Sequence, residues 1–313
     1  MKTWKNVAAA MLIVTWTASP AWSQDKEDDV PTLIKKLQDK EEKVRIKAAM
    51  ELMSNTKGGK AAVSALADAV KKDKSEDVRG YSVVALGNHG KEAKPAIPVI
   101  VAALKDKSTT VRKLAVDALA RIGPLTKEVI PALVANLKNE DLGPHAANAL
   151  GQFGKLAKSA VNDLAKALDK EETRPIAARA LAKIGLDALD ALTKAMEHKQ
   201  KEVRTDVVVA LGQLGKVAVP AMIPGLKDKD VDVRLNTAAA LSRLGRNAKK
   251  AVPALAAALK DKDEDVRERV ASALGAIGPD ARAAVPALKA ALKDKNEHVR
   301  KAVEDALELI QAK

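Results

Sequence analysis

Apolar residues recur along this chain at spacings that belong to α-helices. In residues 252–259 they are separated by three and four positions, and in residues 266–277 by four, three, one and three positions. Such spacings place apolar side chains on one face of a helix. Helices of at most about three turns are marginal alone in water. The pattern therefore predicts short helices that are stabilised by packing against neighbours.

The two segments form a unit that recurs along the sequence. Residues 285–300 repeat residues 252–267 almost unchanged. Most units have a proline near the start of the first helix, a Lys-Asp-Lys turn, and a glycine where the second helix ends; these residues suit helix starts and stops. The polar residues 24–29 precede the first unit. We count nine units, beginning near residues 30, 61, 97, 130, 161, 189, 219, 252 and 285.

Stacking such units would bury their apolar faces in one continuous core. We therefore expect an all-α, right-handed α-α superhelix over residues 30–313. Composition agrees, because 47% of the residues are hydrophobic but only 2% are aromatic. Small and branched aliphatic side chains must then fill the core, which favours close helix packing over a β-sandwich.

The proline start, the Asp-Val-Arg phrase and the Leu-Gly-x-Ile/Leu-Gly ending resemble HEAT repeats of the armadillo-like class. They are most similar to the short bacterial subtype also found in phycobilisome-lyase-like proteins, over residues 30–313. In that family an arginine and a turn aspartate form a ladder between adjacent repeats. The resemblance assigns this structural role to three arginines that follow an aspartate by two residues: Arg79, Arg234 and Arg267. Four arginines match without that aspartate, and their partners stay open: Arg45, Arg112, Arg204 and Arg300.

The fourth and fifth units depart from the pattern. Gly143-Pro144 and Arg174-Pro175 stand at the starts of their second helices. Proline and glycine are unusual at these positions of the repeat, and the fourth unit is also shortened. We expect a local change of curvature near residues 138–176. It would be either drift of the repeat or a hinge that shapes a binding groove.

The formal charge of +13 favours anionic partners such as acidic polymers, nucleic acid or anionic lipid surfaces. Because the lysines recur at the same turn position, solubility alone would also explain them. The chain has no cysteine. A disulfide framework, a Cys-ligated zinc and a thiol nucleophile are therefore excluded.

The N-terminus predicts export. Lys2 and Lys5 precede an apolar stretch from Val7 to Ala18, and small residues precede a cleavage site near Ser23. We expect residues 1–23 to be a signal peptide and the mature protein to be periplasmic or secreted. A retained membrane anchor is the alternative, but the stretch is shorter than the roughly 20 residues that span a bilayer. No later segment is expected to provide a stable transmembrane anchor.

Function is expected where the units differ on an exposed face. In HEAT solenoids the second helices line the concave face, so we take the third, sixth and tenth positions after the Val of Val-Arg. The binding candidates are Tyr81, Asn88, His145, Asn148, Gln152, Arg179, Asp206, Gln213, Asn236 and Arg243. Their amides can donate and accept hydrogen bonds, which suits a peptide backbone or carbohydrate. We predict a monomeric extracytoplasmic scaffold that binds a protein, a peptide or an anionic envelope polymer; an ordinary solvated face is the alternative.

No catalytic arrangement is recognisable. The sequence has no His-x-x-x-His pair, phosphate-binding loop or evident triad, so we expect no enzyme, cofactor or metal. HEAT-fold iron enzymes similar to deoxyhypusine hydroxylase use His-Glu dipeptides, and here the order is reversed in Glu197-His198 and Glu297-His298. The alternatives are a metal oxidoreductase similar to deoxyhypusine hydroxylase, a phycobilin-lyase-like enzyme, and an electrostatic binder of anionic polymer, nucleic acid or lipid. Nucleic acid is not expected, because of export and the scarcity of aromatic stacking partners.

Overall fold

Nine consecutive helix pairs make up residues 28–311, the part of the chain that the computed structural model describes. No strand occurs in that range. The predicted fold class is therefore confirmed: the chain is all-α, and its helix pairs stack into a superhelix. The predicted signal peptide, residues 1–23, lies outside the described residues and stays a prediction.

The helices follow the units of the sequence, one first and one second helix in each. The first helices are α1 (Val30–Lys36), α3 (Gly59–Lys72), α5 (Ile97–Ala103), α7 (Val129–Asn136), α9 (Val161–Ala167), α11 (Leu189–Ala195), α13 (Val219–Met222), α15 (Val252–Ala258) and α17 (Val285–Ala291). The second helices are α2 (Glu42–Ser54), α4 (Glu76–Asn88), α6 (Thr109–Ile122), α8 (Gly143–Gln152), α10 (Arg174–Ile184), α12 (Lys201–Leu214), α14 (Val231–Leu244), α16 (Glu264–Ile277) and α18 (Glu297–Gln311). Short 3-10 helices join or extend them: η1 (Thr56–Gly58), η2 (Gly90–Ala96), η3 (Gly154–Ala160), η4 (Leu186–Ala188), η5 (Gly215–Ala218), η6 (Ile223–Lys227), η7 (Gly245–Ala251) and η8 (Gly278–Ala284).

Local signals begin and end the second helices. The side chain of Asp263 accepts a hydrogen bond from the amide of Val266 at 3.1 Å, and that of Ser108 accepts one from the amide of Val111 at 3.3 Å. These bonds satisfy amides that lack a partner within the helix. At the other end, Gly278 has a φ of +70°, which glycine adopts without the strain that a Cβ would add.

Small residues bring the second helices of adjacent units close together. A Cβ added to Gly87 would lie 3.0 Å from the Cα of Ala118, and one added to Gly151 would lie 2.9 Å from the Cα of Ala180. The buried aliphatic residues form one hydrophobic core that runs through all nine described units. Each unit therefore depends on its neighbours for burial, as expected of a solenoid.

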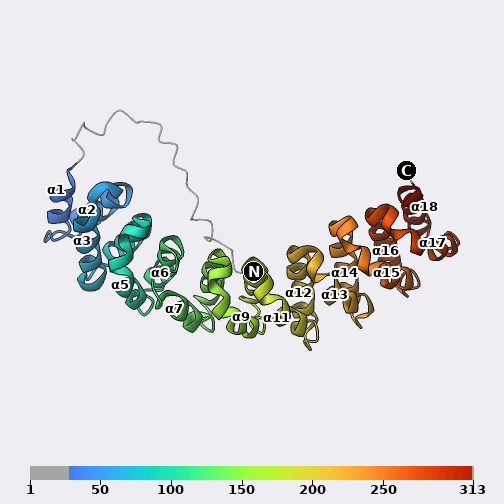
Figure 1. The fold of residues 1–313 in the computed structure, drawn as a ribbon. Helices are drawn as coiled ribbons and strands as arrows, with labels where there is room; N and C mark the ends of the chain where they lie inside the picture. The colour runs from blue at the N-terminus through green and yellow to red at the C-terminus, as the bar shows by residue number, and fades with distance from the viewer. Residues whose placement is uncertain (1–27, 312–313) are drawn as a thin grey trace, which may run out of the picture.

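The units are arranged along an arc (Figure 1). The second helices, such as α12, α14, α16 and α18, line its inner side, and the first helices, such as α9, α11, α13 and α15, lie on its outer side (Figure 1). The side chains that vary between second helices are therefore presented on the concave face.

The outermost described helices carry acidic residues where inner helices carry small ones. Glu51 of α2 takes the place that the buried Ala273 has in α16, and Glu304 and Glu308 of α18 take the places of Ala271 and Gly275. Polar residues at these places make stacking of a further copy less favourable. The monomeric state expected from the sequence stays a prediction.

We expected no segment after residues 1–23 to be long and apolar enough to span a membrane. One stretch of the described structure corrects this expectation by length and composition. Lys201–Lys227 passes that test, with a mean hydropathy of 1.6 over its best window. The stretch comprises α12, η5, α13 and η6, and it is interrupted at Gly215, whose φ is +78°. Its residues Val207 and Leu211 are buried in the solenoid core, whereas Val209 and Val217 are exposed. Packing between units accounts for part of the hydropathy of this stretch.

Candidate binding surface

An arginine–aspartate ladder runs along the edge where each first helix turns into the second. Arg79 of α4 donates from Nε and Nη2 to the carboxylate of Asp106 in the next unit, at 2.7 and 2.8 Å. Its Nη1 donates to the carbonyl oxygens of Asp73 and Lys74 in its own turn, at 3.1 and 3.0 Å. Each arginine therefore holds one turn in shape and joins it to the following unit.

The same two-pronged pairing recurs in four other places. The pairs are Arg45 with Asp73, Arg204 with Asp228, Arg234 with Asp261, and Arg267 with Asp294. In every pair the aspartate belongs to the turn of the following unit. From the sequence, we selected arginines that follow an aspartate by two residues, namely Asp77, Asp232 and Asp265. These aspartates are exposed and form no ladder contact, so this criterion does not identify the partners in the ladder. The stacking of units selects the partner, about 24 to 28 residues further along the chain.

The ladder leaves little charge available to a ligand. Burial alone would raise the pKa of Asp106, but hydrogen bonds from Arg79 and from the amide of Ser108 outweigh it and lower the pKa below 3.8. The two side chains are only 6% and 11% exposed. Such a pair fixes geometry, because each charge is already satisfied by the other.

The ladder is interrupted after the third unit. Asn139 stands where five other turns have the aspartate that pairs with a ladder arginine, and Arg112 instead donates from Nη2 to the hydroxyl of Thr109 at 2.8 Å. The nearest carboxylate, that of Asp141, is 3.6 Å from Nη2. In the fourth unit, Gly143 replaces the arginine itself.

The fifth unit has an arginine but uses it differently. Arg174 bonds to Asp206 on α12, at 3.2 Å, instead of to a turn. The residues before α8 and α10, Leu142 and Thr173, are helical in conformation, whereas Ser75 before α4 is extended. The regular ladder is therefore absent between the third and sixth units. The expected change of curvature near residues 138–176 stays a prediction.

The ten binding candidates separate into two groups on the concave side. The side chains of six form no hydrogen bond or ion pair with another described residue: Tyr81, Asn148, Gln152, Arg179, Gln213 and Arg243. Tyr81 is half-buried and packs against the core, so it offers little to a ligand. The other five are exposed and lie on α8, α10, α12 and α14. We call these five residues the central concave strip.

Two of the remaining four candidates are held by neighbouring helices or by their own helix. Asn88 donates to the carbonyl oxygen of Met53 at 3.0 Å and accepts from Arg121 at 2.5 Å. Asn236 donates to the carbonyl oxygen of Asp232, one turn earlier, at 2.8 Å. Both amides would have to break these bonds before they could bind a partner.

The other two candidates contact an oppositely placed polar side chain of a neighbouring unit where the ladder is missing. Nδ1 of His145 lies 3.5 Å from the carboxylate of Asp117, which joins the third and fourth units. Asp206 pairs with Arg174 across the fifth and sixth units. Burial raises the pKa of Asp206 despite the opposing effect of Arg174. These side chains have structural partners and are weaker candidates for recognition.

The ten binding candidates leave out exposed apolar residues that lie next to the polar ones. Met50 occupies the sixth position of the first unit and is 43% exposed, but the candidates start at the second unit. Val209 occupies the same position in α12 and is 38% exposed. Extending the count to the first unit would have found Met50. The concave face thus combines amides, arginines and isolated aliphatic groups.

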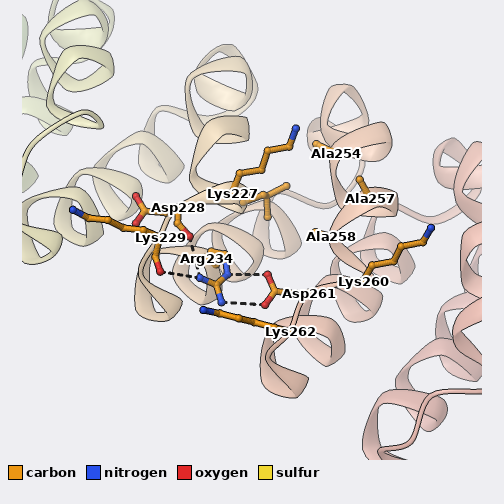
Figure 2. A pocket seen from close by; sticks show the side chains of 11 residues that line it. Lys227, Asp228, Lys229, Arg234, Ala254, Ala257, Ala258, Lys260, Asp261 and Lys262 are labelled. Carbon is orange, nitrogen blue, oxygen red and sulfur yellow. Dashed lines mark hydrogen bonds and ion pairs between the residues drawn. The ribbon is translucent and has the colours of Figure 1, made fainter.

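A cavity of about 330 Å³ opens between the seventh and eighth units, on the ladder side (Figure 2). Ala254, Ala257 and Ala258 line it, and Arg234 and Asp261 pair with each other at its side (Figure 2). Because that pair is satisfied, the exposed lysines at the rim provide the available polar groups. None of the central concave strip lines this cavity.

Within residues 28–311, no group of three or more His, Asp or Glu side chains is arranged to hold a metal ion. Glu197-His198 lies in the turn of the sixth unit, whereas Glu297-His298 begins α18 in the ninth unit. Nε2 of His198 is 2.8 Å from the carboxylate of Asp169 in the preceding unit, so this ring joins two turns. Its role in the described structure is a link between units.

Comparison with known proteins identifies the repeat and the fold. The family model described as HEAT repeats matches residues 63–144, 97–176, 144–212, 161–241 and 219–308. The crystal structure of Kap121p is similar with a TM-score of 0.65 at 15% identity, over 90% of this chain and 37% of that one. Importin beta in an ammonium sulfate condition gives 0.62 at 14%, over 90% and 46%. The Kap95:Nup1 complex gives 0.60 at 14%, over 90% and 46%.

This chain spans less than half the length of these importin-type structures, and the likeness at such identities concerns the fold. Comparison with curated proteins finds no match. The family model, by contrast, covers most of the sequence and nearly all the units seen in the structure. The chain belongs to the HEAT-repeat family.

Proposed function

We propose that this protein is an extracytoplasmic, non-catalytic scaffold that holds a protein or peptide segment on its central concave strip. The observation that carries the proposal is the group of five exposed polar side chains without intramolecular partners on four consecutive second helices. A side chain without an intramolecular hydrogen bond can use all of its donors and acceptors to bind a ligand, because no existing bond has to break first. Location outside the cytoplasm rests on the signal peptide predicted from residues 1–23.

The chemistry of the strip favours a polypeptide ligand. Asn148, Gln152 and Gln213 can each donate to a carbonyl oxygen and accept from an amide, which are the groups that a peptide backbone offers. Arg179 and Arg243 add charged donors for carboxylate side chains. Structures of similar fold were solved with protein partners, RanGDP with Kap95p and Nup1 with Kap95, which supports a protein ligand here.

Affinity capture from the cell envelope fraction tests this proposal. The variant Asn148→Glu/Gln152→Glu/Gln213→Glu replaces amides, which donate and accept hydrogen bonds, with carboxylates, which only accept. We expect its affinity for the partner to fall at least tenfold, which corresponds to about 1.4 kcal/mol or more. The matched control is Gln38→Glu/Asn162→Glu/Asn247→Glu, which likewise replaces three exposed amides with glutamate, outside the strip. Equal recovery of every partner by the wild type and the strip variant would contradict the proposal.

A further inference from the structure

Aliphatic side chains protrude from three consecutive loops at the edge opposite the ladder. Leu156 in η3, Leu186 in η4 and Val217 in η5 are 68%, 64% and 44% exposed. These loops join the second helix of one unit to the first helix of the next, and η3 contacts η4. Single exposed aliphatic residues are common, but a row of three in equivalent loops calls for an explanation. We call these three residues the aliphatic edge.

Packing of the repeat does not require the aliphatic edge. In these loops the buried residue is an alanine three positions after the glycine: Ala93, Ala157, Ala188, Ala218, Ala248 and Ala281. The place of Leu156, two residues after the glycine, is also that of Val217; in other loops it holds Glu92, Asp187, Asn247, Asp280 or the half-buried Leu125. Leu186 lies one residue earlier, where η2, η3, η5 and η7 have lysine or arginine. The fold therefore accepts polar residues at both places, yet η3, η4 and η5 each present one strongly exposed aliphatic residue.

The surroundings of the aliphatic edge are basic. Lys155, Lys158, Lys183 and Lys216 lie beside the three residues in sequence and are all exposed. None of these four lysines has an ion pair with another described residue. Asp187 is the acidic residue of the three loops. The edge therefore combines protruding apolar groups with uncompensated positive charge.

We infer that the aliphatic edge docks the solenoid onto the surface of an anionic phospholipid bilayer. Protruding aliphatic side chains can enter the boundary between headgroups and acyl chains, while neighbouring lysines remain among the lipid phosphates. A bilayer is deformable, so it can surround separate side chains one repeat apart without a shaped pocket. The charge is complementary to anionic headgroups. Because the edge consists of loops at the end of the second helices, docking leaves the helix faces of the concave side uncovered.

Co-sedimentation of the full chain with vesicles tests this inference. With phosphatidylcholine vesicles containing about 30% phosphatidylglycerol, we expect Leu156→Ser/Leu186→Ser/Val217→Ser to bind at least about tenfold more weakly than the wild type. Both proteins carry the same residues 1–27, so their difference reports the loops. The matched control is Met50→Ser/Val209→Ser/Leu309→Ser, which removes the same number of exposed apolar side chains elsewhere. It should bind within about twofold of the wild type.

A fluorescent label gives a second readout that keeps two of the three edge residues, Leu186 and Val217, in place. Because the chain has no cysteine, Leu156→Cys and Lys166→Cys each provide one labelling site, at the edge and on the outer helix α9 respectively. A polarity-sensitive dye at position 156 should shift to shorter wavelength with anionic vesicles, and at position 166 it should not. Pure phosphatidylcholine vesicles should give a smaller shift, and added salt should reduce binding.

Three results would overturn the inference. The first is equal vesicle binding by the wild type and the edge variant, with no shift of the dye at position 156. The second is a wild type that does not bind anionic vesicles at all. The third is a wild type that self-associates through the edge without binding vesicles, seen as an oligomer that the triple serine variant converts to a monomer in light scattering.

Discussion

At the scale of single residues, His89 is the clearest departure from the repeat. It directly follows α4, at the place where other units have core residues such as Ile122 and Ile184, and it is only 6% exposed. Neither ring nitrogen has a hydrogen-bond partner, and the nearest carboxylate, that of Glu92, is 3.9 Å from Nδ1. Burial lowers the pKa of His89 below 6.5, and the charge of Glu92 only partly opposes this. The folded protein therefore favours the neutral ring.

We predict that His89→Ile raises the free energy of unfolding by roughly 1–3 kcal/mol, because it removes two unsatisfied buried nitrogens and adds apolar burial.

The stability that His89 contributes should also depend on pH, with a definite sign. The contribution of the neutral ring is complete above the unfolded pKa of about 6.5 and is lost as pH falls toward the lower pKa of the folded state. Urea titrations at neutral and mildly acidic pH would show a larger loss for the wild type than for the variant. An equal loss would contradict this account.

Gly151 and Gly212 occupy equivalent places in α8 and α12 but meet different surroundings. A Cβ would lie 2.9 Å from the backbone of Ala180 at Gly151, and 3.4 Å from the side chain of Ala240 at Gly212. Alanine in place of glycine gains about 1 kcal/mol of helix propensity at either place. We predict that Gly151→Ala loses roughly 1–3 kcal/mol through overpacking, whereas Gly212→Ala is neutral or stabilising. Thermal unfolding of the pair checks this, and equal shifts would argue against it.

At the scale of helices and turns, the ladder should contribute strongly to stability. Arg79→Ala would leave the carboxylate of Asp106 nearly buried without its charge partner, and it would remove four hydrogen bonds. We predict a loss of about 3–5 kcal/mol in urea unfolding, as for other broken buried pairs. Arg243→Ala, at an exposed arginine without a partner, should change stability by less than about 0.5 kcal/mol.

The pKa of Asp106 adds a check on the same pair. Because this pKa is lowered in the folded state, the stability it contributes is complete above about 3.8 and is lost as pH falls through the folded value. Arg79→Ala should abolish this part of the acid dependence. If the variant kept the acid dependence of the wild type, another group would have to be responsible.

The helices could be predicted from the sequence because each unit repeats its own local signals. The proline starts, the apolar spacing and the final glycines act within one unit, so they are visible without tertiary structure. The ladder partner and the state of the concave residues depend on the next unit. Asn88 and Arg121 lie 33 residues apart in sequence, yet they bond to each other. No spacing within a unit predicts which side-chain amides are left without an intramolecular hydrogen bond. The aliphatic edge likewise becomes visible only when the loops are placed side by side.

At the scale of the whole molecule, the ladder divides the solenoid into two regular arms. Regular pairs join the first three units and the last four, whereas His145–Asp117, Arg174–Asp206 and His198–Asp169 link the units between them. These links have fewer hydrogen bonds than a full ladder pair. The central concave strip and the aliphatic edge both begin on these units and continue onto the sixth and seventh, where Gln213, Arg243 and Val217 lie beside regular ladder pairs. The surfaces proposed for binding thus overlap in part with the region of the solenoid that is least tightly cross-linked.

We predict that hydrogen exchange is faster in α8 and α10 than in α4 and α14, because local opening is easiest where neighbouring units share fewest bonds. The variant Asn139→Asp tests the cause. Its carboxylate can still accept from the amides of Asp141 and Leu142, and it gives Arg112 the acceptor that the other turns provide. Exchange in α8 should slow in this variant, and Asn162→Asp, at an exposed amide on the outer helix α9, should have no such effect. Uniform exchange along the wild-type solenoid, or no slowing with Asn139→Asp, would show that the ladder does not control the stiffness of its centre.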